Sequence, residues 1–239
     1  MVKQGITLPE KIKERVSKYT YAVTDQADFM AIGLQLRDAC YSFSLKTPDG
    51  IIEHLNPGLP GLFNVENSIA AAAAAWLCGA SNEEIIKGIN TFEGVKRRFD
   101  HRINQSGLLY IDDYAHHPEE LKACIGAVRA MYPHRHITGI FQPHLYTRTR
   151  DFAAGFAQSL SLLDKVMLLN IYPARELPIE GVDSELILKN ITTADKMLCS
   201  KQDVMKELSE HKPDILLTLG AGDIELMVAD IEKLFQTED

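Results

Sequence analysis

The chain has 239 residues, of which 46% are hydrophobic and 24% charged, and its formal net charge is -8. This size and composition predict a globular protein with one large or two modest domains. The acidic balance argues against a general nucleic-acid-binding surface, which needs clustered basic residues. The longest apolar run, residues 69–78, is too short to span a membrane, and the first residues lack the pattern of a signal peptide. The 4 Cys are widely spaced with no CxxC pair, which indicates reduced thiols in a cytoplasmic protein.

The first part of the chain predicts a small antiparallel sheet. Residues 1–28 look irregular, apart from a short strand expected at 19–23. Residues 29–55 are expected to form antiparallel strands, because apolar and polar side chains alternate along 41–46 with the two-residue period of a half-buried strand. The turn between two of these strands is expected at 47–50.

Two helices are expected next, at 64–77 and 82–90. Asn64 and Ser81 are suitable N-caps for them, since their side chains can accept a hydrogen bond from the first turn. No linker rich in Pro or Ser follows, and residues 94–99 are the expected hinge between two units.

Strands alternate with helices in the rest of the chain. The expected elements are a hairpin of strands at 99–104 and 108–112, strands at 136–141, 165–170, near 197 and at 215–219, and helices at 118–131, 148–162, 184–190, 202–210 and 223–235. This alternation predicts an α/β fold with a mainly parallel sheet that helices cover on both faces.

A polar loop after the expected strand at 136–141 carries His144, Arg148 and Arg150. Both arginines fall at the start of the next helix, where the positive end of the helix dipole disfavours cations. An anion is therefore expected to compensate them, either Asp151 or a bound substrate. We favour the substrate, because ligands of α/β sheets sit at the carboxyl ends of strands.

A second polar segment, residues 112–120, also ends a strand and begins a helix. Pro118 and the two glutamates after it suit a helix start. The helix start does not explain two adjacent Asp and two adjacent His, which could hold ribose hydroxyls through a carboxylate and anionic oxygens through an imidazole. A zinc site is the alternative, although no HExxH or CxxC spacing supports it. The histidines that it would draw on are His116, His117, His134, His136 and His144.

Three further features admit both a structural and a binding interpretation. Asn64 and Asn67 share a helix face, and Asn67 could present the donor and acceptor that adenine recognition requires. Residues 96–98 are either a solvated charge run or a hinge that places an Arg on a phosphate. Residues 219–223 are either a tight strand–helix turn or an anion-binding loop, although the third Gly of a dinucleotide fingerprint is missing.

In combination, these segments resemble the Mur ligases of bacterial peptidoglycan synthesis. Single motifs are weak, but their order is that of the family over nearly the whole chain. They are NVENSIAA at 64–71, GVKRRFD at 94–100, DDYAHHP at 112–118, FQPHLYTRTRD at 141–151, YPA at 172–174 with PI at 178–179, and GAGD at 220–223.

The resemblance covers only the later part of the family's central ATPase domain and all of its C-terminal domain. No Gly in the sequence is followed by Lys, so the family's phosphate loop and its lysine are not in this chain. We therefore expect residues 1–98 to be an incomplete α/β ATPase domain and residues 99–239 a Rossmann-like domain. The incomplete domain is expected to expose apolar helix faces, which predicts disorder near residues 1–28, self-association, or both.

The resemblance implies a reaction for the parent enzyme, and the loop at 141–151 favours the members that act on UDP-N-acetylmuramate and L-alanine. ATP would phosphorylate the lactyl carboxylate of UDP-N-acetylmuramate and leave as ADP. The amine of L-alanine would attack the acyl phosphate, and phosphate would leave from the tetrahedral intermediate as the amide bond forms. The enzyme would act mostly by positioning the reactants and by neutralising their negative charge with Mg²⁺, Lys, Arg and His. The metal ligands are expected mostly upstream of this chain, which by itself is expected to be inactive.

Comparison of these segments with the family's motifs suggests a role for each candidate residue. The resemblance implies that Asn64 and Asn67 bind adenine, Asp113 the ribose hydroxyls and Arg98 the nucleotide phosphates. His116 and Arg148 would be the catalytic and substrate-binding pair near the lactyl carboxylate and the incoming alanine, with His144 a further substrate contact. No metal ligand is assigned. The departures from the family pattern are Phe63 for a common His, Leu145 for a common Arg and Arg175 for a usual Gly.

A zinc site would imply a third kind of protein, a metal hydrolase. Two further alternatives to the ligase remain open. One is the murein-tripeptide recycling ligase of the same family, which looks different at the 141–151 loop. The other is a non-catalytic nucleotide-binding module of the same fold.

Overall fold

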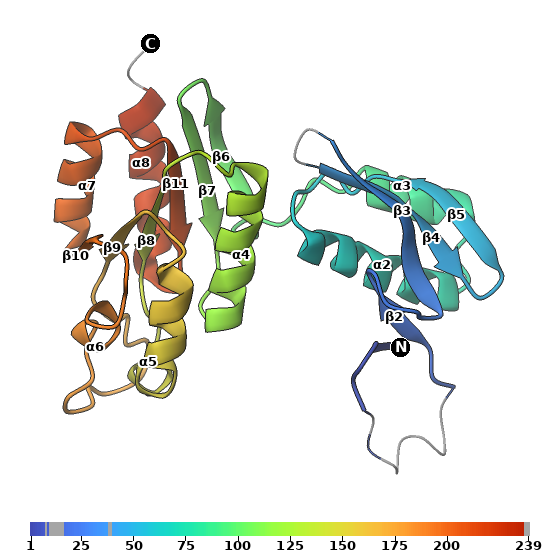
Figure 1. Cartoon of the computed structure of the whole chain (residues 1–239), viewed down its shortest axis with the longest axis horizontal. Coiled ribbons are helices and arrows are strands. Elements are labelled where there is room, and N and C mark those ends of the chain that lie inside the picture. Colours follow the sequence, from blue (N-terminus) through green and yellow to red (C-terminus); the bar gives the residue numbers. More distant parts are fainter. Residues whose placement is uncertain (8, 10–16, 38–39, 237–239) are drawn as a thin grey trace. The chain divides into compact units, whose positions relative to one another are not determined.

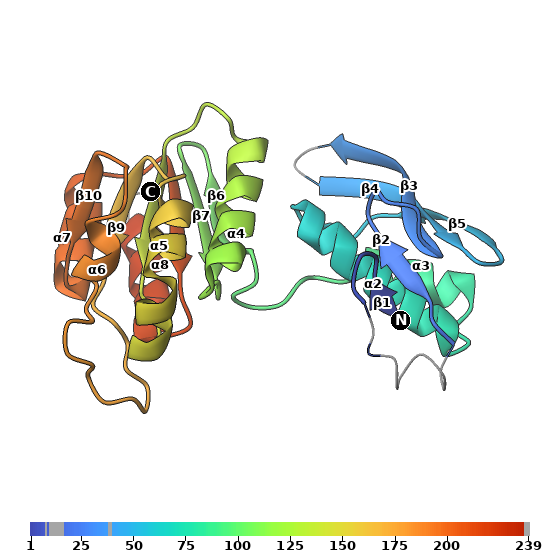
Figure 2. The same ribbon diagram turned by 60° about the horizontal axis from the view of Figure 1, so that its bottom comes forward.

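The computed structural model describes residues 1–7, 9, 17–37 and 40–236. It divides into two compact units, unit 1 at Met1–Gly94 and unit 2 at Val95–Asp239 (Figures 1 and 2). Within the described residues, no helix combines the length and apolarity needed to cross a membrane.

Unit 1 contains a 5-stranded sheet in the order β1-β2-β3-β4-β5. The strands are β1 Val2–Lys3, β2 Thr20–Ala22, β3 Phe29–Arg37, β4 Cys40–Thr47 and β5 Gly50–Leu55. The pairings β3–β4 and β4–β5 are antiparallel, which confirms the antiparallel segment predicted from the alternating pattern. β1 lies in the stretch expected to be irregular and pairs in parallel with β2, while residues 8 and 10–16 of that stretch lie outside the described residues.

The core of unit 1 lies between this sheet and helices α2, Leu62–Leu77, and α3, Asn82–Asn90. The side chains that fill it are Phe29, Ala31, Phe43, Leu45, Ile52, Leu55, Val65, Ile69, Ala72, Ala73 and Ile85. Ser81 is the N-cap of α3 in a capping box with Glu84, as predicted. Asn64 is not the N-cap of α2, because the helix starts at Leu62 after Gly61; the Asn64 amide instead donates to the Pro60 carbonyl at 2.7 Å.

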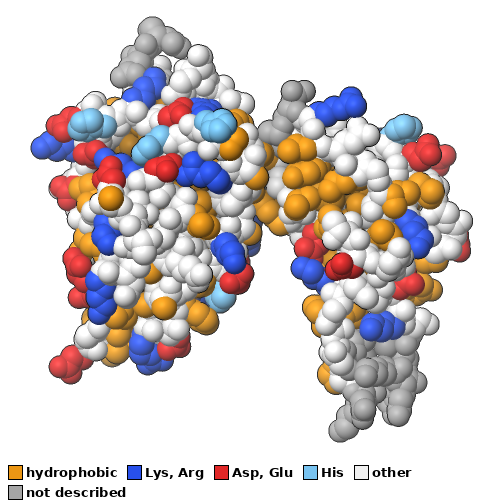
Figure 3. Space-filling view, viewed as in Figure 1, with side chains coloured by type: hydrophobic (Ala, Val, Ile, Leu, Met, Phe, Trp, Pro, Cys, Tyr) orange, Lys and Arg blue, Asp and Glu red, His pale blue; other side chains and the backbone are white. Residues whose placement is uncertain are grey.

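Part of the surface of unit 1 is apolar, and Figure 3 shows hydrophobic side chains gathered over one part of it. The exposed large hydrophobic residues of unit 1 include Leu36, Ile51, Leu62, Leu77 and Phe92. Burial of such a surface against another molecule would be favourable, but self-association of the chain stays a prediction.

Unit 2 contains a 6-stranded sheet in the order β10-β9-β8-β11-β7-β6. Its strands are β6 Asp100–Gln105, β7 Leu108–Asp113, β8 Ile137–Phe141, β9 Lys165–Leu168, β10 Asp195–Leu198 and β11 Ile215–Leu219. β6 is antiparallel to β7, and the other pairings are parallel. The structure therefore confirms the α/β class with a mainly parallel sheet in this part of the chain.

Helices cover both faces of this sheet (Figures 1 and 2). α4, Pro118–Met131, and α5, Tyr146–Leu160, pack side by side on one face, with the short α6, Glu185–Leu188, beside α5. α7, Lys201–Glu210, and α8, Val228–Gln236, cover the other face with apolar residues such as Val204 and Ile231. The last helix, expected as one element from 223, begins instead with a 3-10 turn at Asp223–Met227.

The register of the parallel strands aligns their carboxyl ends. Leu219 at the end of β11 pairs with Asp113 of β7 on one side and with Phe141 of β8 on the other. Phe141 in turn pairs with Leu168 at the end of β9. The loops that follow these strands therefore leave the sheet from one edge, where α/β proteins place their ligands.

Two capping boxes test whether the units unfold independently. Ser81 caps α3 in unit 1, and Ser200 caps α7 in unit 2 through Asp203 with the same geometry. We expect Ser81→Ala to destabilise unit 1 by about 1 kcal/mol and to leave unit 2 unchanged, because the loss of an N-cap acts on its own helix. Ser200→Ala is the matched control, with the opposite pattern. Amide hydrogen exchange resolved by residue measures both, and equal loss of protection in both units from either variant would contradict independent unfolding.

Candidate functional site

The loop between β7 and α4 places His116 at the carboxyl edge of the sheet of unit 2. His116 Nδ1 lies 2.9 Å from the Tyr114 carbonyl oxygen, which can only accept, so this ring nitrogen carries a proton. In the neutral ring, Nε2 is therefore the atom that can accept one. The Glu120 carboxylate accepts the backbone N–H groups of His116 and His117 at 2.9 and 3.2 Å, which ties the loop to the first turn of α4.

The loop between β8 and α5 places His144 and Arg148 at the same edge. Its last residue, Leu145, precedes α5 with a positive φ of 73°, a conformation that is unfavourable for a residue with a Cβ. Two backbone hydrogen bonds hold this loop to the one after β9: Leu145 N–H donates to the Tyr172 carbonyl at 2.9 Å, and Tyr172 N–H donates to the Pro143 carbonyl at 2.8 Å.

The side chains of His116, His144 and Arg148 lie close together, and we call them the cationic cluster. The ring centroids of His116 and His144 are 6.4 Å apart, and Arg148 Nη1 lies 3.4 Å from His144 Nδ1. Because a guanidinium only donates, His144 Nδ1 accepts and the neutral ring carries its proton on Nε2. Burial, followed by the neighbouring Arg148 and His116, lowers the pKa of His144. The structure thus brings the predicted catalytic and substrate-binding residues into one group.

His117, the neighbour of His116, makes a different contact. His117 contacts the Phe152 ring at a centroid distance of 4.7 Å. Phe152 is 41% exposed, whereas Phe156 and Leu160 of the same helix are fully buried. Phe152 therefore packs against the loop that contains His117 and not in the core.

Asp113 is buried and already hydrogen-bonded within unit 2. Its two carboxylate oxygens accept the backbone N–H groups of Phe99 and Ala115, each at 2.7 Å. Burial raises its pKa, and these two hydrogen bonds oppose the shift. The carboxylate thus holds the start of β6 and the loop after β7, while ribose binding by Asp113 stays a prediction.

Arg97 forms a network that runs from the buried Asp112 to the exposed Glu225. Its guanidinium donates to Asp112 at 3.0 Å, to Glu225 at 2.8 Å and to the Gly220 carbonyl at 2.6 Å. The other oxygen of Asp112 accepts the Thr218 hydroxyl at 2.6 Å. Burial raises the pKa of Asp112, and the Thr218 and Arg97 contacts oppose that shift. Two adjacent Asp at the end of a strand were the only signal in the sequence for this network.

The linker segment that contains Arg98 folds onto unit 2. The guanidinium carbons of Arg97 and Arg98 lie 5.1 and 5.5 Å from the centroid of the Tyr114 ring, within the range of cation–π interactions. The Arg97 carbonyl accepts Tyr114 N–H at 2.7 Å. The hinge expected over 94–99 is therefore shorter, because Arg97, Arg98 and Phe99 are bonded to unit 2.

The adenine-binding candidates belong to unit 1. Asn64 and Asn67 lie one turn apart in α2, and Asn67 is exposed while Asn64 donates to Pro60. The assignment of both to adenine stays a prediction.

The loop at 220–223 makes a tight turn. Gly220 has a φ of 137°, and a Cβ there would lie 2.7 Å from the Gln142 carbonyl oxygen. The Gln142 side chain binds Asp223 Oδ1 at 2.7 Å and the Ile224 N–H at 2.9 Å. The Gln142 side chain thus ties this turn to the loop after β8, which supports the structural interpretation of residues 220–223.

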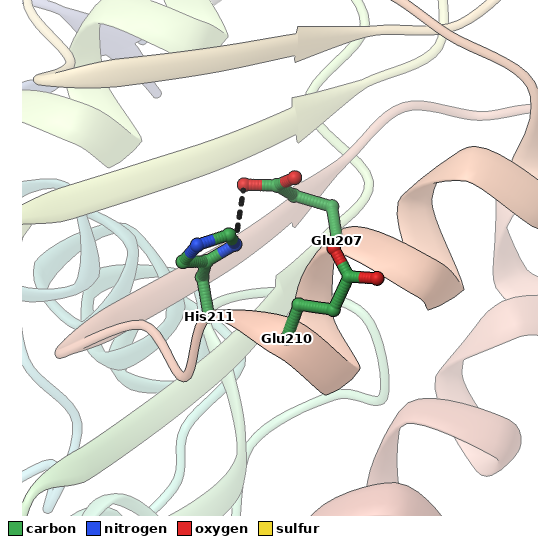
Figure 4. A group of neighbouring side chains, drawn as sticks. All are labelled: Glu207, Glu210 and His211. Atoms are coloured by element: carbon green, nitrogen blue, oxygen red, sulfur yellow. Dashed lines mark ion pairs between the residues drawn. The ribbon is translucent and has the colours of Figure 1, made fainter.

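The described residues contain one group of side chains with metal-ligand geometry, formed by Glu207, Glu210 and His211 near the end of α7 (Figure 4). None of the histidines considered for a zinc site belongs to it. Glu207 already pairs with Lys165 and with His211. The group also lies at the carboxyl end of α7, away from the aligned ends of the strands.

This arrangement, with polar loops at the carboxyl edge of a parallel sheet and a cationic cluster among them, is that of a binding or catalytic α/β domain. The family model described as "Mur ligase, glutamate ligase domain" matches residues 97–222. The chain therefore belongs to the Mur ligase family.

Individual relatives agree with the family. A UDP-N-acetylmuramate–L-alanine ligase from Parabacteroides distasonis is 45% identical over 234 residues, which are 98% of this chain and 51% of the relative. The structure of a UDP-N-acetylmuramate-alanine ligase from Thermotoga maritima matches with a TM-score of 0.74 at 21% identity, over 96% of this chain and 50% of that one. A murein peptide ligase from Psychrobacter arcticus matches with a TM-score of 0.64 at 22% identity, over 90% and 46%. The chain spans about half the length of the curated relatives it matches.

The Arg97–Asp112 ion pair predicts resistance of the linker to trypsin. We expect Asp112→Asn to speed cleavage within residues 96–98 about tenfold or more, because it removes the buried carboxylate charge that pairs with the partly buried Arg97 guanidinium. Glu225→Gln is the matched control, since it removes an exposed partner of the same guanidinium and should change the rate less than about twofold. Fragment appearance is followed by mass spectrometry, and equal rates in wild type and Asp112→Asn would show that the ion pair does not hold the linker.

Proposed function

We propose that the chain is part of an ATP-dependent ligase that joins L-alanine to UDP-N-acetylmuramate through an acyl phosphate, in peptidoglycan synthesis. The names of the curated relatives support the reaction. The observation that carries the proposal is the cationic cluster, because His116, His144 and Arg148 meet at the carboxyl edge of the sheet.

The proposed ligation needs side chains that neutralise negative charge, and it needs no covalent intermediate with the protein. A carboxylate becomes a good electrophile once it is phosphorylated, and negative charge then develops on its oxygen when the amine attacks. Arg148 would donate hydrogen bonds to that oxygen, which is a strong interaction for a permanently charged guanidinium. His116 would meet the reactants through Nε2, the ring atom left by its contact with Tyr114.

Residues for the nucleotide are present in part. Asn67 is exposed and has both a donor and an acceptor, which suits adenine, and Arg98 would bind the phosphates from unit 2. Asp113 would contact ribose through the lone pairs that its two backbone hydrogen bonds leave.

The described residues do not fit Mg²⁺ at this site. Asp112 and Asp113 are engaged by Arg97 and by backbone N–H groups, and the group with metal-ligand geometry lies at the end of α7. The Mg²⁺ ligands of the proposed enzyme would therefore lie mostly outside this chain.

We place the reaction in the cytoplasm, where ATP is available and where thiols such as those of Cys124 and Cys199 would stay reduced. Self-association through the apolar surface of unit 1 is a further expectation for the chain by itself.

The murein-tripeptide recycling ligase remains the second candidate, because a murein peptide ligase shares the fold. The two differ in the amine that is accepted, which is L-alanine in one case and a peptide in the other. A non-catalytic nucleotide-binding module would bind nucleotide without turnover even when joined to the missing half.

The isolated chain is expected to be inactive. The sequence contains no Gly-Lys pair, so the phosphate loop that holds the transferring phosphoryl group is missing. We expect no phosphate release above background from the chain with ATP, UDP-N-acetylmuramate and L-alanine. Alanine-dependent release by the purified chain, measured by a coupled phosphate assay, would refute this.

The cationic cluster is tested in a fusion of this chain to the upstream half of the Parabacteroides distasonis relative. We expect alanine-dependent phosphate release from the fusion, and a loss in kcat of roughly 100- to 1,000-fold on Arg148→Ala, typical for removal of one donor to a developing oxyanion. Arg150→Ala is the matched control, because Arg150 lies in the same helix but pairs with Asp151 at the surface. Equal losses in the two variants would contradict the assignment, and a preference for a tripeptide over L-alanine would favour the recycling ligase.

A further inference from the structure

Helix α5, which carries Arg148, begins without the local groups that normally stabilise a helix start. Its N-cap residue, Leu145, provides no side-chain hydrogen bond, and its first turn contains no acidic residue. A helix start leaves backbone N–H groups unpaired and carries a partial positive charge, which a nearby arginine makes worse.

A distant residue, Glu176, supplies what the helix start lacks. One of its carboxylate oxygens accepts the Thr147 N–H at 3.0 Å, and the other accepts the Thr147 hydroxyl. These two contacts lower the pKa of Glu176, so the charged form is the one that the site favours. Asp151, one of the two anions expected to compensate the arginines, pairs with Arg150.

The backbone fixes Glu176 opposite Thr147. The loop after β9 is bonded to the loop before α5 through Tyr172, whose ring also stacks on His144 at a centroid distance of 5.7 Å. A tight turn follows, with Ala174 at a φ of 51° and the Glu176 N–H bonded to the Pro173 carbonyl at 2.9 Å. This turn places the carboxylate of Glu176 beside Thr147 in the first turn of α5.

We propose that Glu176 is a positioning residue, which replaces the missing cap of α5 and so holds Arg148 and His144 in the cationic cluster. Its part in the reaction rests on the proposed function. The positioning itself is a property of unit 2 and requires neither nucleotide nor turnover.

Glu176 also supplies the negative charge beside His144. The charged and titratable groups that face this ring are Arg148 from α5, His116 from the loop after β7, and Tyr172 and Glu176 from the loop after β9. Arg148 and His116 lower the pKa of His144, whereas Glu176 raises it. Removal of the Glu176 charge should therefore lower that pKa further.

The experiment uses the 239-residue chain itself. NMR measures the pKa of the His144 imidazole and the exchange rate of the Thr147 amide hydrogen in wild type, Glu176→Gln and Glu176→Ala. Gln keeps an acceptor for the Thr147 N–H but loses the charge, and Ala loses both. Glu180→Gln is the matched control, because Glu180 is exposed on the same loop and carries the same charge.

Each variant has a distinct expected result. Glu176→Gln should lower the pKa of His144 and leave the exchange of Thr147 within about twofold of wild type. Glu176→Ala should lower the same pKa and speed that exchange roughly five- to tenfold, the usual effect of a lost cap. Glu180→Gln should change neither.

Two results would overturn the proposal: unchanged exchange of Thr147 in Glu176→Ala, or a pKa of His144 in Glu176→Gln no lower than in the control. Either result would leave the ligase assignment intact. An inactive fusion enzyme, in turn, would not affect the role of Glu176 at the start of α5.

Discussion

The site depends on one constraint, the register of the parallel strands in unit 2. Leu219, Asp113, Phe141 and Leu168 lie abreast, so the loops after four strands leave the sheet at the same edge. Because β11 inserts between β7 and β8, these two strands are not adjacent, and the loops that follow them can approach each other above the end of β11. His116 and Arg148, which the chain separates by a helix and a strand, meet there.

Buried polar groups then fix the loops. Asp112 and Asp113 end β7 in an apolar sheet, where an unpaired carboxylate would be costly. Asp112 is compensated by Arg97 and Thr218, and Asp113 by two backbone N–H groups. Both sets of contacts include the linker, so the burial of these carboxylates also attaches residues 97–99 to unit 2. The linker arginine that is proposed to bind phosphate therefore moves with the C-terminal sheet.

The long loop after β9 has a comparable effect on α5. It pairs with the loop before the helix through Tyr172 and places a carboxylate on Thr147. The strained backbone of Leu145 is thus held by contacts with a segment remote in sequence, a common arrangement near functional sites. Leu145 and Arg175, two positions that depart from the family pattern, lie in the loops joined in this way.

Local sequence pattern determined most of the helices and strands of this protein. The strand and helix positions, the antiparallel segment, the Ser81 cap and the mainly parallel sheet follow from the periodicity of apolar residues and from turn and cap chemistry, which act over a few residues. Three local expectations were wrong: the cap at Asn64, the irregular structure where β1 lies, and the start of the last helix at 223. The candidates His116, His144 and Arg148 were visible because their residue types do not suit an ordinary strand end or helix start. Only the tertiary structure decided that Arg97 pairs with Asp112 and that Glu176 serves α5, because each contact joins residues far apart in the chain and depends on strand order and register, which no local pattern encodes.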